Sequence, residues 1–211
     1  MSDGDPGGAR PRLVIATRSV HKLRELRELL RLERAELVSL DELGVPGDPI
    51  EDGETFEANA LIKARYAARM TDLPSLADDS GIQVDALGGG PGVRTRRFAG
   101  EDATDADNNA RMLAELNGFP PDGRGARYVC SLVFVRPDGL PTLATCGTCR
   151  GRIALAPRGA GGFGYDPIFE PSSEPPGGRT LGEWSADEKN AISHRARAAR
   201  RMSRRLAPLG F

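Results

Sequence analysis

The stretch LADDSGIQVD places two carboxylates, Asp78 and Asp79, side by side between two apolar runs. Like charges repel and burial penalises their ionised forms, so this pair needs a compensating cation. A carboxylate at the carboxyl end of a sheet strand is well placed to bind a metal ion together with substrate phosphates. An Asx-type turn or loop cap is the alternative. Because successive strand residues face opposite sides, only one of the two acids can point fully into a given cleft.

The segment Thr17–Lys22 contains the parts of a phosphate-binding turn. It joins an apolar run to an amphipathic helix, so backbone amides point outward beside hydroxyl groups, and Lys22 supplies a cation. An ordinary helix with Ser19 as its N-cap and a surface lysine explains the same residues. Taken alone, this segment favours the ordinary capped helix.

Three residues near the C-terminus, Lys189, His194 and Arg195, form a further group of cationic or titratable side chains. Their offsets of five and six residues do not share one face of a continuous helix. If all three serve one site, the helix must break between them, and Ser193 can cap a second helix that starts at His194. Free N–H groups and positive side chains would then form an anion site.

The sequence contains a glycine-rich pattern and a C-x-x-C pattern, and neither predicts the site that it usually marks. Gly159–Gly164 matches G-x-G-x-x-G, but Pro167 follows closely and opposes the helix that a dinucleotide fingerprint must open. No G-x-x-x-x-G-K-[ST] pattern is present. Cys146 and Cys149 form C-x-x-C, but they lie in a predicted strand that runs into a turn. Reduced strand thiols are therefore favoured over metal or redox use.

Alternating strand and helix patterns predict an α/β fold around these residues. Strands are predicted at 13–17, 35–40, 75–77, 127–135 and 140–149, and helices at 19–32, 55–70 and 104–117, with a helical region from 186 onward. The third strand is expected to end at the paired aspartates, with extended chain again at 82–86. Pro137-Asp138-Gly139 predicts a hairpin turn between the last two strands.

Length and composition limit the remaining possibilities. The 211 residues suit one domain over 13–211, preceded by a Gly/Pro/Asp-rich tail, 1–12, that we expect to be disordered. No apolar run approaches the roughly 20 residues of a membrane helix, so a soluble, cytoplasmic protein is expected. The formal net charge of −1 gives no reason to expect a nucleic-acid partner.

Six segments together resemble the inosine triphosphate pyrophosphatase family. They are LVIATRSVHKLRELRELL, TFEANALIKA, LADDSGIQVDALGGGPGV, FAGEDATD, GGFGYDPIF and DEKNAISHRARA, in the family's order over residues 13–207. The resemblance implies a mixed, twisted sheet flanked by helices, with two lobes around a central substrate cleft. It also implies a homodimer and Mg2+-dependent hydrolysis of ITP, dITP and XTP to the monophosphate and pyrophosphate, which cleanses the nucleotide pool.

The same resemblance assigns roles to individual residues. Asp79 corresponds to the metal-binding acid that is usually also the catalytic base, and Glu51 to a metal-associated glutamate. Substrate contacts correspond to Thr17, Arg18, Ser19, Val20, His21, Lys22, Lys63, Ser80, Phe163, Gly164, Tyr165, Asp166, Lys189, His194 and Arg195. The chain departs from the family where Ser19 replaces the usual Asn, where Arg18 and His21 often have Gly as counterparts, and where Ala196 replaces Gly.

The implied reaction fits the chemistry of these side chains. Lys22, Lys63, Lys189 and Arg195 can neutralise a triphosphate together with Mg2+. A donor from His194 or Arg195 would favour a purine with a 6-keto acceptor over adenine, and Phe163 can stack on the base. Two alternatives stay open: a pyrophosphatase for modified pyrimidine nucleotides, and a non-catalytic nucleotide-binding protein.

Overall fold

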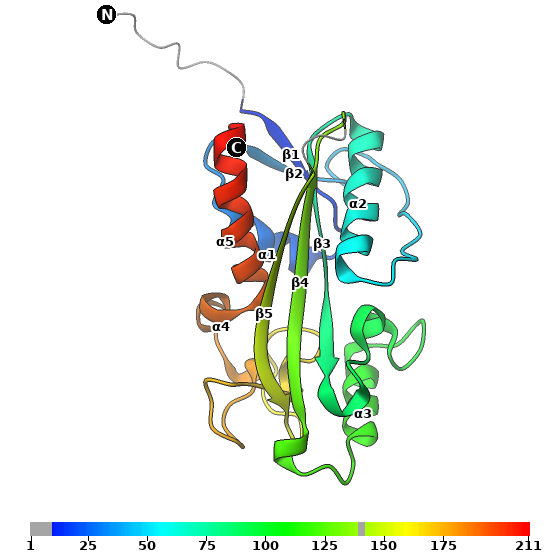
Figure 1. Ribbon diagram of the computed structural model, residues 1–211, viewed down its shortest axis with the longest axis vertical. Coiled ribbons are helices and arrows are strands. Elements are labelled where there is room, and N and C mark those ends of the chain that lie inside the picture. The colour runs from blue at the N-terminus through cyan, green and yellow to red at the C-terminus, as the bar shows by residue number, and fades with distance from the viewer. Residues whose placement is uncertain (1–9, 139–141) are drawn as a thin grey trace, which may run out of the picture.

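A six-stranded mixed sheet forms the centre of the protein in a computed structural model, which describes residues 10–138 and 142–211 (Figure 1). The strands are β1 (Arg12–Ile15), β2 (Glu36–Ser39), β3 (Ser75–Val84), β4 (Gly125–Val135), β5 (Leu143–Ile153) and β6 (Phe169–Pro171), in the spatial order β2-β1-β3-β4-β5-β6. β1 pairs in parallel with β2 and β3, and the other neighbours are antiparallel. Most of the expected tail, and Gly139 of the expected turn, lie outside the described residues.

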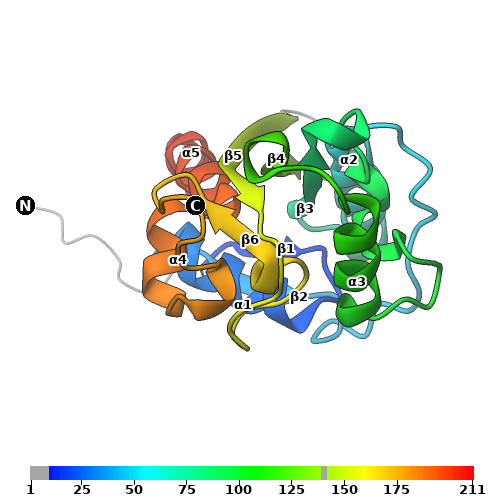
Figure 2. The same cartoon turned by 90° about the horizontal axis from the view of Figure 1, so that it is seen from below.

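The predicted helices form, and side chains at their N-termini explain where they begin. The helices are α1 (Val20–Leu30), α2 (Phe56–Thr71), α3 (Asp105–Glu115), α4 (Ala186–Ile192) and α5 (His194–Leu206). Each begins after a Ser or Thr whose hydroxyl accepts a backbone N–H of the first turn: Ser19, Thr55, Thr104, Ser185 and Ser193. α1 and α5 pack together on one side of the sheet and α2 lies on the other (Figure 2).

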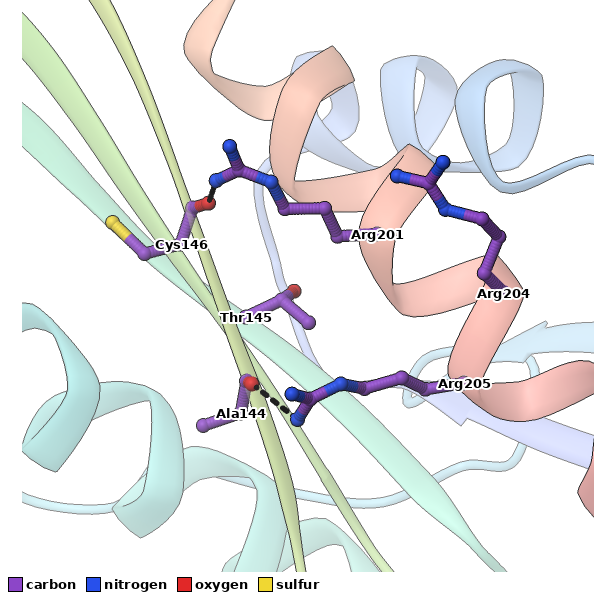
Figure 3. Close-up of a pocket in the computed structure, with 6 residues that line it drawn as sticks. All are labelled: Ala144, Thr145, Cys146, Arg201, Arg204 and Arg205. Atoms are coloured by element: carbon purple, nitrogen blue, oxygen red, sulfur yellow. Dashed lines mark hydrogen bonds between the residues drawn. The ribbon is translucent and has the colours of Figure 1, made fainter.

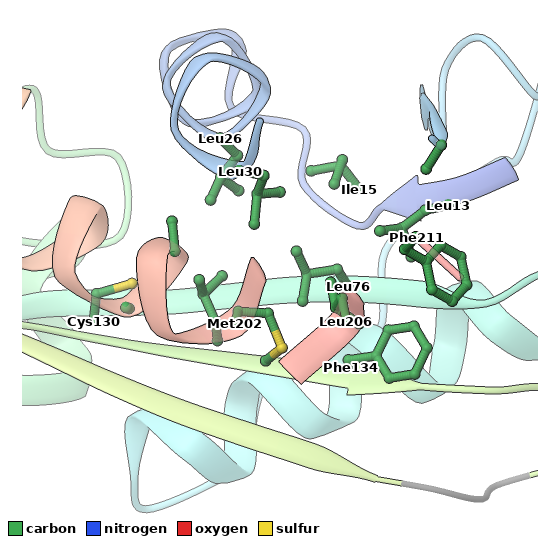
Figure 4. Close-up of a cluster of buried hydrophobic side chains, with 14 residues drawn as sticks. Leu13, Ile15, Leu26, Leu30, Leu76, Cys130, Phe134, Met202, Leu206 and Phe211 are labelled. Carbon is green, nitrogen blue, oxygen red and sulfur yellow. The ribbon is translucent and has the colours of Figure 1, made fainter. Parts of the chain in front are cut away.

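Strand alternation in β1 separates two hydrophobic layers. Leu13 and Ile15 face the cluster shared with α1 and α5, which also contains Leu26 and Met202 (Figure 4). Val14 faces the opposite cluster, which includes four alanines of α2. The sheet is therefore buried on both faces at this end, which suits its apolar β1. A third cluster joins the far ends of β3, β4 and β5 to α3.

The prediction that the third strand ends at the aspartates is wrong. β3 continues through both, because their backbones pair with β4 at Asp78–Leu132 and Asp79–Ser131. On its other edge β3 pairs with β1 only as far as Leu76. The next hydrogen bond on that edge is at Ile82, whose N–H donates to the Thr95 hydroxyl at 2.9 Å. The interval between them leaves an open strand edge that carries both carboxylates.

The hairpin of β4 and β5 is longer than predicted. β5 continues to Ile153 because its glycines keep pairing with β4 instead of forming a turn. A side chain at Gly151 would collide with the backbone of Glu170, so glycine permits the pairing with β6. Among the described residues, no helix is long and apolar enough to cross a membrane.

Candidate active site

A cleft of about 980 Å³ opens along the uncovered edge of β3. Its volume is in the range of small-molecule sites. It is lined by every residue that the sequence assigned to a site: Thr17, Arg18, Ser19, Val20, His21, Lys22, Glu51, Lys63, Asp79, Ser80, Phe163, Gly164, Tyr165, Asp166, Lys189, His194 and Arg195. Six separate stretches of the chain, at 17–22, 51, 63, 79–80, 163–166 and 189–195, therefore converge on one cavity.

Asp79 lies on the α2 side of β3. Its carboxylate accepts a hydrogen bond from Lys63 Nζ at 3.1 Å, and the same ammonium forms an ion pair with Glu51 at 3.0 Å. Asn59 donates to the other Asp79 oxygen at 3.4 Å. Burial raises the pKa of Asp79, opposed by the nearby lysines, and attraction by three carboxylates outweighs burial to raise the pKa of Lys63. Asp79 is thus a costly carboxylate held beside a firmly charged lysine.

Asp78 lies on the opposite side of the same strand and is fully buried. Lys22 Nζ contacts its Oδ2 at 3.2 Å, and Arg195 Nη2 contacts the same atom at 3.3 Å. Burial would raise the pKa of Asp78, but the charges of Lys22 and Arg195 lower it well below its ordinary value. Strand alternation therefore separates the two acids as predicted. Asp79 lines the cleft, and Asp78 holds two of the cations of the cleft, Lys22 and Arg195.

A chain of alternating charges continues from Asp78 toward the C-terminal helices. Arg195 pairs with Glu25 of α1, and Glu25 also pairs with Lys189 at 3.3 Å. Lys189 then contacts Asp166 at 2.7 Å. Arg195 is almost completely buried, so these pairings hold in place a charge that could not otherwise be tolerated there.

The break between α4 and α5 occurs where the sequence predicted it. Ser193 has extended backbone angles and its hydroxyl accepts from Ala196 N–H at 3.1 Å, so α5 begins at His194. The His194 ring stacks on Tyr128 at a centroid distance of 4.7 Å. Burial, reinforced by the charges of Arg195 and Lys189, lowers the pKa of His194 well below its ordinary value. The buried imidazole is therefore neutral, and its Nδ1 has no partner among the described residues.

The glycine-rich loop forms one wall of the cleft. It leads into a short 3-10 helix at Asp166–Ile168 and opens no α-helix, in agreement with the prediction against a dinucleotide fingerprint. The Phe163 ring lies parallel to His21 at 5.4 Å and 4.5 Å from Lys189 Nζ. Asp166 is buried and accepts the Phe163 N–H at 3.0 Å. Asp166 therefore holds the loop, and Phe163 presents the aromatic surface.

The turn before α1 uses its side chains in different ways. The Ser19 hydroxyl accepts from Lys22 N–H at 3.4 Å, so it caps the helix. Arg18 points away from that cap and binds Asp41 and, at 3.2 Å, Asp48. It also donates to backbone carbonyls of the loop 41–48. Arg18 thereby ties the turn to the loop that carries Glu51.

Sequence reasoning missed four residues that support the site: Glu25, Asn59, Asp105 and Tyr128. Asn59 accepts from Gly53 N–H at 2.8 Å and so joins the Glu51 loop to Asp79. Asp105 accepts from Gly164 N–H at 2.7 Å. Only Glu25 had a local signal, since it lies one turn beyond Lys22 on the same helix face. The others act across distances in sequence that no spacing rule covers.

The candidate metal ligands fit a hard divalent cation. Asp79 and Glu51 each place one oxygen against the same Lys63 ammonium, so two carboxylates already face one shared positive charge. Mg2+ in nucleotide sites is typically held by one or two carboxylates plus substrate phosphates. Among the described residues, no group of three His, Cys, Asp or Glu side chains could hold a metal without substrate. Oxygens of a bound phosphate would have to complete the coordination of an ion held by these two carboxylates.

The C-x-x-C pattern forms no joint site. Cys146 is exposed whereas Cys149 is buried, and both are free thiols. Burial raises the pKa of the Cys149 thiol. This agrees with the expectation of reduced strand thiols.

Comparison with known proteins agrees with the geometry of the site. Residues 13–205 match the sequence profile of the Ham1 family. A dITP/XTP pyrophosphatase of Geobacillus kaustophilus is 47% identical over 186 residues, covering 88% of this chain and 89% of the relative. That of Escherichia coli K12 is 46% identical over 188 residues, covering 89% and 93%. The structure of a HAM1 protein from Coxiella burnetii superimposes with a TM-score of 0.85 at 41% identity, covering 94% of this chain and 99% of the other.

Proposed function

The chain belongs to the Ham1 family, and we propose that it is a dITP/XTP pyrophosphatase that releases the nucleoside monophosphate and pyrophosphate. The observation that carries this proposal is the Asp79–Lys63–Glu51 arrangement in a cleft that also gathers Lys22 and Arg195. A triphosphate needs several cations, and Lys22 of α1 and Lys63 of α2 supply them beside the two aspartates. The acids beside them suit hydrolysis better than binding alone.

The residues of the cleft suggest how the reaction proceeds. Lys22 and Lys63 hold the triphosphate with its α-phosphorus near Asp79. A water molecule attacks that phosphorus, the bond to the α,β-bridging oxygen breaks, and pyrophosphate leaves. Asp79 accepts the proton of the water, for which its raised pKa is suited.

Asp79 and Glu51 are also the residues that would hold Mg2+. When bound, the ion would neutralise developing charge on the phosphate oxygens and on the leaving pyrophosphate. Lys63 already occupies the position between the two acids and would share their charge with the ion.

The base wall of the cleft accounts for selection of a 6-keto purine. Phe163 provides a stacking surface, and Lys189 and Arg195 place N–H donors close to it. Those donors attract the 6-keto acceptor of hypoxanthine or xanthine. The 6-amino group of adenine would leave them unpaired in a buried place, a mismatch that can discriminate by orders of magnitude.

A substrate panel tests the proposal. The protein is incubated with Mg2+ and ITP, dITP, XTP, GTP, ATP or modified pyrimidine triphosphates, and the products are identified by chromatography. We expect monophosphate plus pyrophosphate, fastest from dITP, ITP and XTP. Release of single phosphates, or preference for ATP, would contradict it. Preference for a pyrimidine would favour a different pyrophosphatase, and binding without turnover would favour a non-catalytic protein.

The remaining expectations stay proposals. We interpret the third hydrophobic cluster as the core of a second lobe, with the cleft between the lobes. A single domain, a homodimer and a cytoplasmic location are likewise predictions. Sedimentation equilibrium at micromolar concentration would test the dimer.

A further inference from the structure

The outer face of α5 carries an unusual concentration of charge. The helix contains six arginines and no acid, and one of the six, Arg195, is buried in the cleft. The other five, here called the arginine face, are exposed: Arg197, Arg200, Arg201, Arg204 and Arg205. Across residues 10–138 and 142–211, none of these five takes part in an ion pair. Ten of the 26 arginines form ion pairs among the described residues, so the arginine face is distinguished by its density, with five unpaired arginines on one helix.

Part of the arginine face forms an ordered row along the edge of β5. Three guanidinium groups donate to alternate carbonyls: Arg197 to Thr148 at 2.9 Å, Arg201 to Cys146, and Arg205 to Ala144 at 3.0 Å (Figure 3 shows the last two). Four helical residues rise about 6 Å and two strand residues about 6.8 Å, so helix and edge run nearly in register. Each guanidinium uses one nitrogen on the strand and keeps other donors for a ligand.

Close packing holds this row in place. A side chain at Gly147 of β5 would lie 2.1 Å from the His194 carbonyl, so α5 rests directly against the strand. Thr145 adds a hydrogen bond to the Ala198 carbonyl at 3.1 Å. The groove between helix and strand has a volume of about 380 Å³, and Arg204 lines its outer side without contacting the strand (Figure 3).

We propose that the arginine face binds the phosphate backbone of duplex nucleic acid without regard to sequence. The three guanidinium groups of the row span about 13 Å. Along the axis of a duplex, each strand has one phosphate per 3.4 Å, so this length corresponds to roughly four phosphates of one strand. Arginine binds phosphate bidentately and carries its charge at every physiological pH. The net charge of −1 concealed this surface, because acids elsewhere in the chain cancel a charge that is concentrated on one helix.

Other occupants fit the surface less well. A two-fold dimer through α5 would bring arginines against arginines. Addition of another strand to β5 would have to displace the three guanidinium groups. The groove residues include no aromatic side chain on which single-stranded bases would stack. The exposed large hydrophobics that could anchor a membrane lie outside α5, at Val20, Ile50, Met70, Phe119 and Leu155.

Salt-dependent binding to DNA tests this proposal independently of catalysis. Binding of the full chain to a fluorescent 20-base-pair duplex is measured by anisotropy between 25 and 200 mM NaCl. For three to five phosphate contacts, we expect log K to fall against log salt with a slope between about −2.7 and −4.5. Arg204→Gln should reduce the steepness by about 0.9, and Arg200→Gln/Arg204→Gln by about 1.8. ITP turnover should be unchanged in both variants, because neither side chain lines the cleft.

A control of equal charge decides whether the location matters. Arg24→Gln/Arg111→Gln removes two arginines that are paired with Glu28 and Glu115, and it should leave the slope unchanged. An equal reduction in the control would overturn the proposal, as would a wild-type slope near zero. Tighter binding to single-stranded DNA, to tripolyphosphate or to anionic vesicles, with loss in the α5 variants, would also overturn it by assigning the face to another ligand.

Discussion

Two basic regions of this protein use their charges in opposite ways. Each cation of the cleft, namely Lys22, Lys63, Lys189 and Arg195, is mostly buried and contacts at least one carboxylate. The arginines on the outer face of α5 are exposed and contact carbonyls or solvent. Buried ion pairs fix the orientation of the cationic side chains and so support selective binding. The exposed arginines instead produce an electrostatic field that salt can screen. Substitutions in the cleft should therefore have large effects that depend on the residue, and substitutions on the arginine face should have small effects that depend on charge.

The largest effect is expected at Asp79. Asp79→Asn removes the proton acceptor and a metal-binding oxygen while keeping the shape of the side chain, so kcat should fall on the order of 10⁴-fold. Burial raises the pKa of Asp79, so its ionised form is already disfavoured in the fold, and Lys63 keeps Glu51 as a partner. The free energy of unfolding should therefore change by no more than about 1 kcal/mol. Steady-state release of pyrophosphate and urea unfolding measure the two quantities. Asp52→Asn, in the exposed loop beside Glu51, is the control that should retain activity.

Asp78 should reverse this pattern, with its main effect on stability. Asp78→Ala leaves Arg195 and Lys22 without their buried partner, which should reduce the free energy of unfolding by about 3 to 5 kcal/mol. Glu28→Ala, which breaks a surface pair with Arg24, should cost less than about 0.5 kcal/mol under the same urea titration. A loss below 1 kcal/mol for Asp78→Ala would show that the buried network contributes little to folding.

The contrast between these acids shows how far the sequence could lead. Alternation along β3 was enough to place Asp78 and Asp79 on opposite sides, and the offsets among Lys189, His194 and Arg195 were enough to predict a helix break at Ser193. These inferences depend on local geometry, which a few residues determine. The end of β3 was predicted wrongly because the cost of two strand carboxylates is offset by cations from α1, α2 and α5, which are distant in sequence.

The supporting residues of the site were hidden for the same reason. Asn59 and Asp105 act on backbone N–H groups of loops that become neighbours only in the folded chain. The arginine face could not be predicted from the net charge, because the net charge of a chain carries no information on where its charges lie. Its helical spacing was visible in the sequence, but its freedom from acidic partners required the structure.

His194 gives an intermediate effect that tests its burial in the cleft. Its pKa is lowered in the folded protein, so below about pH 6.5 the unfolded chain binds a proton that the folded chain does not. The free energy of unfolding should therefore decrease as the pH is lowered, by about 1.4 kcal/mol from pH 7.5 to pH 5.5. The chain has two histidines, so His194→Gln should remove this dependence and His21→Gln should keep it. Urea unfolding at several pH values measures it, and an unchanged slope in His194→Gln would assign the effect to other groups.

The smallest effect is expected on the arginine face. Arg204 lies one turn from Arg200 and Arg201, and such like-charged neighbours destabilise a helix by a few tenths of a kcal/mol. It also lies in the last turn of α5, where a positive charge is favoured by about the same amount. Arg204→Gln should therefore change the free energy of unfolding by less than about 0.5 kcal/mol in either direction, while Arg195→Gln, in the cleft, destabilises the fold by several times as much. Thermal and urea unfolding of both variants at 50 and 500 mM NaCl would measure this. Equal losses would remove the distinction between the two regions, because they would mean that Arg204 supports the fold as Arg195 does.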